Sequence, residues 1–501
     1  MIDFVKSLLL YSFAAVVALL VHSEIARLRG RVAGIDGPRG LPIFGNIPQL
    51  RRNASEQYRI WAEKYGAVYQ VMLGSVAVVV VNSAEAAQRV FVRNSAATIS
   101  RPMFYTFHKV VSSTSGFTIG TSPYSASLRK RRKAAASALN KRAVTSYDAH
   151  ISRETQQFIR DAYELGEKGK KALDPLALVQ HLSLNLSLTL NWGSRIASVH
   201  DPLFQEIAEV EEYVSRFRST TGNMQDYVPL LRWWPFNTAS ARAREMRTRR
   251  DVYIRRFNRE LQQRLKNGEK VDCIQANVMA EESLDSQELM SLSLTMVAGG
   301  LDTITTLVSW ALLLLAHKPD IQNKAYLAIK EHRMSTNDAT ECAYMVALVR
   351  ELLRMYPPLR LALPRETASD FCFNDKLIPA GTVVVLNAWA CNMDPEVYPD
   401  AHVFKPERFL DSNGRVQPGS IFTYGQGSRM CPGYILGNRE LYMLFSRLLY
   451  LFEIKLAAGG SDADPLTGVA DPTSLVSAPK EYKVIFSPRD RKQIERMLSE
   501  K

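Results

Sequence analysis

The chain has 501 residues, 46% of them hydrophobic, and a formal net charge of +13. This composition excludes a disordered chain, because the hydrophobic content is ample for a large core. Five dispersed cysteines exclude a disulfide framework and favour a reducing compartment, and the eight histidines form no zinc signature. The length exceeds the roughly 150 residues of a typical domain, yet no internal repeat or low-complexity tract divides it.

The first segment, residues 1–22, is predicted to be a membrane anchor. Residues 7–21 are uncharged and rich in Leu, Ala and Val, and extension back to Ile2 reaches the length of about 20 residues that a span needs. Arg27, Arg29 and Arg31 follow, which places them in the cytosol by the positive-inside tendency. A cleaved secretory peptide is the alternative, but no small-residue cleavage site precedes the arginines. We therefore expect a single-pass signal anchor in the endoplasmic reticulum membrane.

The next segment, residues 23–50, is basic and rich in proline, and it predicts a semi-rigid linker between the membrane and a domain at 51–501. Residues 69–73 and 76–81 predict a β-hairpin around Gly74 and Ser75, and residues 382–387 a further strand. Most other periodic segments predict helices. The fold class is therefore mainly α with a small β-sheet subdomain.

The densest basic cluster is RKRRK at 129–133, on a helix predicted to begin near Ser125. It has no interleaved aromatic residues, so we expect no nucleic-acid partner. One interpretation is a solvated helix face. The other is a docking face for an acidic partner that is guided by electrostatic steering.

A long apolar segment at 289–316 contains Gly299, Gly300, Asp302 and Thr303. Two glycines within a helix cost about 1 kcal/mol each relative to alanine, so they need a reason, such as the close approach of a flat cofactor. A kinked core helix and a second membrane span are the alternatives. The aspartate and the many Ser and Thr residues argue against a span.

An acid and a base, Glu351 and Arg354, lie three residues apart on one face of a predicted helix. Such a pair alone is usually a solvated surface ion pair of small energy. A second arginine, Arg408, follows in the segment PERF at 406–409.

The segment YGQGSRMCPG at 424–433 places Cys431 in a glycine-rich loop before an apolar helix predicted over 434–452. A lone cysteine in a turn is usually a structural residue. Here the glycines and the helix N-terminus direct N–H groups and positive potential at the sulfur, which favours a thiolate metal ligand. Arg429 is suited to pair with an anionic group of a cofactor.

Taken together, these motifs resemble the cytochrome P-450 family. The resemblance implies one large, mainly helical domain that binds haem b, with Cys431 as the axial thiolate ligand of the iron. It implies that Glu351 and Arg354 lock to Arg408 and fix the cysteine region, and that Asp302 and Thr303 deliver protons to oxygen. It also assigns Gly427, Gly433 and Tyr424 to the haem loop, although the family usually has Phe at the Tyr424 position.

The haem propionates are expected, by the same resemblance, to contact Arg429, Arg365 and His108. The family typically has Trp at the start of the basic helix and Arg four residues later. This chain has Tyr124 and Leu128 at those positions. A third interpretation of the basic run is that one or more of its arginines turn inward to a propionate, and the sequence leaves open whether Arg129 or Arg132 does so.

The activity implied by the resemblance is a monooxygenase reaction that uses O2 and electrons from NADPH through a diflavin reductase on the same membrane. Three segments, at 101–109, 117–123 and 217–223, resemble fungal phenylacetate hydroxylases and related small-phenol hydroxylases. Phe104 and Phe107 are candidates for an aromatic wall around the substrate, or else core residues. Arg218 is the candidate for holding a substrate carboxylate, or else a helix-surface charge.

Two substrate classes remain open. One is an aryl acid such as phenylacetate, hydroxylated on the ring in catabolism. The other is a cresol or hydroxybenzyl-type phenol of fungal polyketide secondary metabolism, which the departures near Tyr124 favour. A haem-thiolate isomerase or a non-catalytic haem or ligand binder is a further alternative, and the intact pair of Asp302 and Thr303 argues against it.

Overall fold

Helices make up most of the computed structural model, which describes residues 2–499 except 235, 282, 336–340, 458 and 460. The α-helices are α1 (Ile2–Arg29), α2 (Ile47–Leu50), α3 (Ala54–Tyr65), α4 (Ala84–Ala87), α5 (Ala126–Ala138), α6 (Lys141–Ser146), α7 (Asp148–Leu165), α8 (Leu176–Trp192), α9 (Pro202–Phe217), α10 (Ala239–Lys266), α11 (Ile274–Ala280), α12 (Ser286–His317), α13 (Pro319–Ser335), α14 (Ala343–Met355), α15 (Ala388–Asn392), α16 (Tyr434–Leu451) and α17 (Arg491–Ser499). Shorter π and 3-10 turns are η1 (Gln88–Arg93), η2 (Tyr105–Val111), η3 (Met224–Asp226), η4 (Pro229–Arg232), η5 (Pro406–Phe409) and η6 (Gly427–Arg429).

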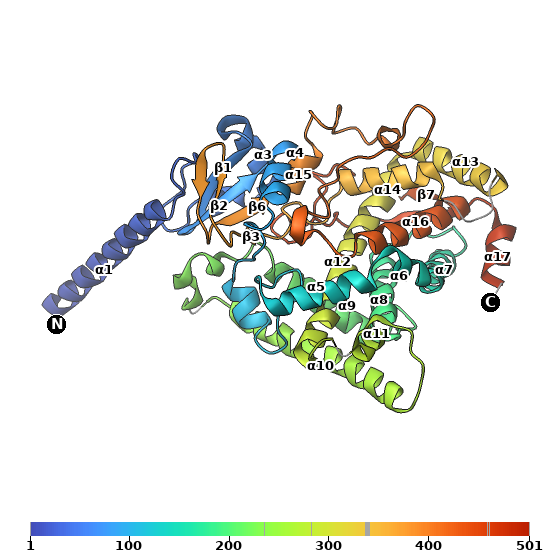
Figure 1. Ribbon diagram of the computed structural model, residues 1–501, viewed down its shortest axis with the longest axis horizontal. Coiled ribbons are helices and arrows are strands. Elements are labelled where there is room, and N and C mark those ends of the chain that lie inside the picture. Colours follow the sequence, from blue (N-terminus) through green and yellow to red (C-terminus); the bar gives the residue numbers. More distant parts are fainter. Residues whose placement is uncertain are drawn as a thin grey trace.

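The strands form one four-stranded sheet and two two-stranded antiparallel sheets, β4-β5 and β7-β8. They are β1 (Val68–Leu73), β2 (Val76–Val81), β3 (Arg365–Glu366), β4 (Phe371–Phe373), β5 (Lys376–Ile378), β6 (Val383–Leu386), β7 (Phe452–Leu456) and β8 (Val484–Pro488). The sheet order is β1-β2-β6-β3, in which β2 and β6 are parallel and the other pairs antiparallel. The predicted hairpin and the further strand are confirmed, and the sheet lies at one end of the helical domain (Figure 1).

The long helix α12 runs through the middle of the domain and packs on α8, α5, α9 and α16 (Figure 1). Its capping box, in which Asp285 and Glu288 bond each other's backbone N–H groups, fixes its start. Two apolar clusters meet on it, one toward α14 and α16 and the other toward α9 and α10. Although α12 is apolar and long enough for a span, 67% of its most apolar window is buried, as in a core helix.

The N-terminal helix α1 continues to Arg29, beyond the predicted anchor end at residue 22, and projects from the sheet side of the domain (Figure 1). It is apolar and long enough to cross a membrane, and none of its most apolar window is buried. The linker expected over 23–50 does not stay outside the domain. Val32 and Ile35 are buried against the sheet, and the Gln70 side chain bonds the backbone of both.

Candidate active site

A cavity with about 300 Å³ of water-accessible space lies between α12 and the loop before α16. Asp302 and Thr303 of α12 line it on one side, and Tyr424, Cys431 and Gly433 of the loop line it on another. The rest of the wall is mostly aliphatic. The structure therefore brings together two motifs that lie far apart in the sequence.

The cysteine loop is held by its own backbone. The Cys431 N–H donates to Tyr424 O at 2.9 Å, and the Met430 N–H donates to Gly427 O at 3.0 Å. Gly427 has φ 63°, and a Cβ there would lie 1.8 Å from Phe91 O, so only glycine fits. Burial raises the pKa of the Cys431 thiol, while the Gly433 N–H and the Arg132 guanidinium act in the opposite direction.

Four arginines, Arg101, Arg132, Arg365 and Arg429, line the cavity near this loop. Burial lowers the pKa of all four, to about 9 for Arg365 and Arg429. Repulsion by the other arginines lowers it further in Arg101, Arg365 and Arg429. Within the described chain none of them forms an ion pair, and Arg365 Nη1 and Arg429 Nε have no hydrogen-bond partner. Unpaired buried cations require an anionic ligand, so this cluster fits the two propionates of a haem.

A haem held in this cavity would have the arginine cluster for its propionates and Cys431 as the candidate thiolate ligand of its iron. Arg101 was missed by sequence reasoning, which left open whether Arg129 or Arg132 of the basic helix faces the haem site. Arg132 Nη2 donates to Met430 O at 3.1 Å, and Arg131 is also turned inward. Arg129 and Lys133 of the same run are exposed, so only part of it is a solvated face.

His108, expected to contact a propionate, does not line the cavity. Its Nδ1 accepts from the Phe104 N–H at 3.0 Å, and its Nε2 contacts Thr121 O at 3.1 Å. Both ring nitrogens are thus engaged with the backbone, and burial lowers the pKa of the imidazole. The expected contact of His108 with a propionate is corrected, because a neutral imidazole with both nitrogens in hydrogen bonds has no donor left for a propionate.

Phe104 and Phe107 also lie outside the cavity wall and do not form the expected aromatic wall. Phe104 packs edge-on against Tyr227 in the cluster beneath the sheet, with ring centroids 5.7 Å apart. Phe107 is buried in the cluster of α9 and α10, where the Arg218 guanidinium lies 5.8 Å from its ring centroid. Ring-sized side chains here serve the core, and the cavity wall is mainly aliphatic.

The two glycines of α12 are explained by different features of their surroundings. A Cβ at Gly299 would meet nothing within 4 Å, and this residue opens onto the cavity. A Cβ at Gly300 would lie 2.2 Å from Ser187 Oγ of α8, so this glycine permits close helix packing. Thr303 Oγ1 donates to Gly299 O, which fixes the hydroxyl beside the open stretch of backbone.

Asp302 pairs with Arg218, which follows α9. The Arg218 Nη2 atom lies 3.5 Å from Asp302 Oδ2, and the two side chains are 8% and 13% exposed. Burial raises the pKa of Asp302 to about 7 although Arg218 opposes this shift. Both residues line the cavity. Arg218 is thus neither a helix-surface charge nor part of the propionate cluster.

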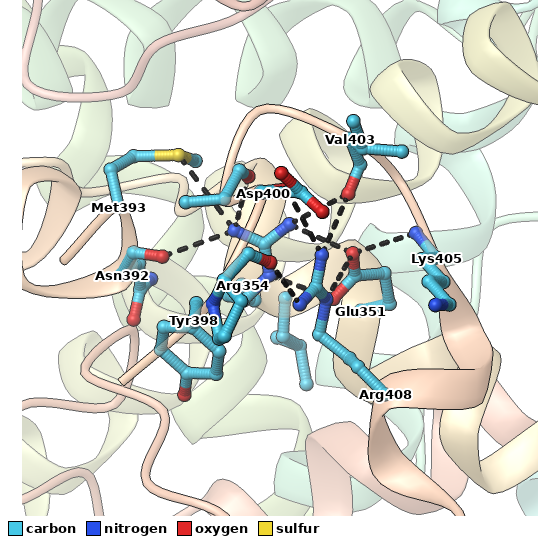
Figure 2. Close-up of polar contacts among 12 residues, drawn as sticks. Glu351, Arg354, Asn392, Met393, Tyr398, Asp400, Val403, Lys405 and Arg408 are labelled. Atoms are coloured by element: carbon cyan, nitrogen blue, oxygen red, sulfur yellow. Dashed lines mark hydrogen bonds and ion pairs between the residues drawn. The ribbon is translucent and has the colours of Figure 1, made fainter. Parts of the chain in front are cut away.

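Glu351, Arg354 and Arg408 form a buried ion cluster (Figure 2). Arg354 donates to both Glu351 oxygens at 2.7 and 2.8 Å, and Arg408 Nε donates to Glu351 Oε1 at 3.0 Å. The remaining guanidinium donors bond backbone carbonyls such as Ala401 O and Pro399 O. This arrangement ties α14 to the segment before the cysteine loop, and it is unlike a solvated surface pair.

A further acid, Glu440 of α16, lines the cavity and was missed by sequence reasoning. It is buried, and burial raises its pKa to about 8. The sequence signal for a cavity position was the place of Glu440 nine residues after Cys431, on the helix that follows the loop.

Comparison with known proteins agrees with this site. A sequence model of the family described as Cytochrome P450 matches residues 35–486. The 3-hydroxyphenylacetate 6-hydroxylase of Emericella nidulans is 52% identical over 97% of this chain and 95% of its own length. The phenylacetate 2-hydroxylase of the same organism is 38% identical over 94% of this chain and 93% of its own length. A cytochrome P450 monooxygenase of Mycosarcoma maydis is 40% identical over 92% of this chain and 88% of its own length. The chain therefore belongs to the cytochrome P450 family and is a P450 monooxygenase with a haem-thiolate site.

Proposed function

We propose that this monooxygenase hydroxylates the aromatic ring of an arylacetate such as phenylacetate or 3-hydroxyphenylacetate. The observation that carries the proposal is Arg218, a buried guanidinium on the wall of an otherwise largely aliphatic cavity. Relatives that match nearly the whole chain are named for hydroxylation of two such acids. The cresol and hydroxybenzyl substrates of the alternative class carry no charge to match this arginine.

The roles of the residues follow from their places. Arg218 holds the substrate carboxylate, and aliphatic side chains such as Ile119, Met296 and Leu363 pack on the ring and exclude water. When bound, a haem b with a cysteine thiolate ligand supplies the activation of dioxygen for oxygen insertion. Cys431 and the four arginines hold that group, and Asp302 and Thr303 move protons at the cavity face of α12.

The test is product formation by microsomes that contain this protein and an NADPH-dependent reductase, offered phenylacetate, 3-hydroxyphenylacetate and m-cresol in parallel. Ring-hydroxylated arylacetates are the expected products. Products from m-cresol alone, as hydroxybenzyl alcohol or a dihydroxytoluene, would contradict the arylacetate proposal and favour secondary metabolism of phenols.

The membrane and the electron donor form a second part of the proposal. We propose that α1 anchors the protein in the endoplasmic reticulum membrane, with the domain in the cytosol beside a diflavin reductase. An exposed apolar patch lies in and directly after η4, and it consists of Leu230, Trp233, Trp234 and Phe236. The turn between β1 and β2 is approached by Tyr227, which precedes this patch, and by Gly30, which follows α1. An apolar helix and an aromatic patch on one side suit a membrane surface.

This second part is tested by alkaline carbonate extraction of the microsomes. The full chain is expected to stay with the membrane pellet. A variant that lacks residues 2–29 should be released largely or in part, the remainder being held by the aromatic patch. Release of the full chain would contradict the anchor.

A further inference from the structure

One face of α9 carries a polar stripe into an apolar part of the core. Glu211 and Ser215 lie one helical turn apart, and Arg218 follows at the end of the helix. All three are buried or nearly so, among Val214, Phe217 and other members of the apolar cluster around α12. Glu211 Oε2, Ser215 Oγ and Arg218 Nε are buried without a hydrogen-bond partner among the described residues. Because such atoms destabilise a fold, the stripe calls for a role beyond packing.

The ion pair at the end of this stripe is incomplete. Arg218 and Asp302 approach only to 3.5 Å, which is longer than a normal charge-assisted hydrogen bond. Arg218 Nε and Asp302 Oδ2 have no hydrogen-bond partner among the described residues. The Arg218 guanidinium also lies over the Phe107 ring, which limits its rotation. Arg218 therefore has free donors at the cavity, and Asp302 is held only loosely.

The charges around Asp302 are finely balanced. Burial, Glu211 and Glu212 favour its neutral form, whereas Arg218 and the Ser215 hydroxyl favour its ionised form. Glu211 accepts from the Tyr253 hydroxyl at 2.5 Å, and Arg250 is the other cation that acts on Arg218. A substrate carboxylate at this place would both engage the donors of Arg218 and add negative charge beside Asp302. Each change favours a proton on Asp302.

We propose that a substrate carboxylate displaces Asp302 as the ion-pair partner of Arg218, and that Asp302 then binds one proton from solvent. The inference rests on the proposed arylacetate function. In this step the substrate carboxylate stays ionised beside Arg218, and the Asp302 carboxylate gains one proton and becomes a neutral acid. The substrate thereby loads the proton donor of the cavity before the reaction begins. A neutral ring compound leaves Asp302 paired with Arg218 and brings no proton with it.

Proton uptake on binding is measured by isothermal titration calorimetry of the haem-loaded protein at pH 8. Phenylacetate is titrated in phosphate and in Tris, whose ionisation enthalpies differ, and phenylacetamide serves as the uncharged isostere. At pH 8, one unit above a pKa of about 7, Asp302 of the free protein is mostly ionised. Binding of phenylacetate should therefore be accompanied by the uptake of about half to one proton per site by the protein. Phenylacetamide should take up almost none.

The variants separate the possible sources of the proton. Asp302→Asn should bind phenylacetate as tightly as the unmodified protein or several-fold more tightly, with the uptake abolished. Glu209→Gln, an exposed acid of α9, is the matched control and should keep the uptake. Binding of phenylacetate without proton uptake, or uptake that persists in Asp302→Asn, would overturn the inference.

The same titration distinguishes this inference from the proposed function. Arg218→Gln should weaken the binding of phenylacetate at least tenfold and leave that of phenylacetamide nearly unchanged. If Arg218→Gln binds phenylacetate normally, the carboxylate role of Arg218 is wrong and the inference falls with it. If binding weakens but the unmodified protein takes up no proton, the arylacetate function stands and only the proton coupling is wrong.

Discussion

Two buried clusters of arginine and carboxylate in this protein have opposite character. In the first, Glu351 accepts two hydrogen bonds from Arg354 and a third from Arg408, at 2.7–3.0 Å. In the second, Arg218 and Asp302 approach to 3.5 Å and both keep unpartnered atoms. A fully bonded buried ion cluster fixes a fold, and breaking it leaves an uncompensated charge. An incompletely bonded one at a cavity is available for a ligand and for protons.

The strongest test of this contrast is removal of one arginine from each cluster. Arg354→Met should abolish most of the haem-loaded protein, because it leaves Glu351 short of partners in the core, at a cost of about 3–5 kcal/mol. Arg218→Met should give a normal or slightly higher yield. The yield is read from the carbon-monoxide difference spectrum of the reduced protein. A normal haem yield in Arg354→Met would remove the structural role of this cluster.

A smaller effect is expected from neutralising the acids. The pKa of Asp302 is raised from 3.8 to about 7, so the folded state binds more protons than the unfolded state between these values. Stability therefore falls as pH rises through this window, by at most about 4 kcal/mol at 1.36 kcal/mol per pKa unit. Asp302→Asn should raise the thermal midpoint at pH 8 and less so at pH 5.5.

The matched variant in the other cluster is Glu351→Gln. It should lower the thermal midpoint at both pH values, because Arg354 and Arg408 lose their counter-ion. If Asp302→Asn lowered the midpoint at pH 8 as Glu351→Gln does, the two clusters would not differ in kind.

Catalysis offers a third comparison. Arg218→Gln should lower kcat/KM for phenylacetate about 10- to 100-fold, since a hydrogen bond to a charged group contributes about 1.5–3 kcal/mol. Arg216→Gln, an exposed neighbour that pairs with Glu212, is the control and should change little. Equal decreases in both variants would indicate a general disturbance at the end of α9 and would contradict a specific bond from Arg218 to the carboxylate. Initial rates of product formation provide the measurement.

The smallest effect on turnover is expected from exposed charges that belong to neither buried cluster. Arg129 and Lys133 are exposed on α5, the helix whose inner arginines face the haem site. Arg129→Glu combined with Lys133→Glu should raise the apparent KM for the reductase several-fold at low salt and little at high salt. Lys141→Glu on α6 is the control. Salt-independent loss of turnover would exclude electrostatic docking at this face.

Local sequence determined most of the framework of this protein. The apolar periodicity of residues 289–316 and 434–452 predicted α12 and α16, and the valine-rich run before residue 82 predicted the sheet hairpin. These features depend on neighbours a few residues apart, so a sequence displays them directly. The pairing of Glu351 and Arg354 on one helix face was visible for the same reason.

The tertiary structure alone decided which side chains meet in the cavity. Arg218 and Asp302 lie on different elements, and their pairing depends on how α9 packs across α12. Arg132 faces the cysteine loop while Arg129 faces solvent, although both belong to one basic run. His108, which sequence reasoning placed at the haem, is engaged by backbone instead. Long-range packing selects among side chains that are chemically equivalent in the sequence, because burial and partner distance, rather than residue type, set the charge and the role of each group.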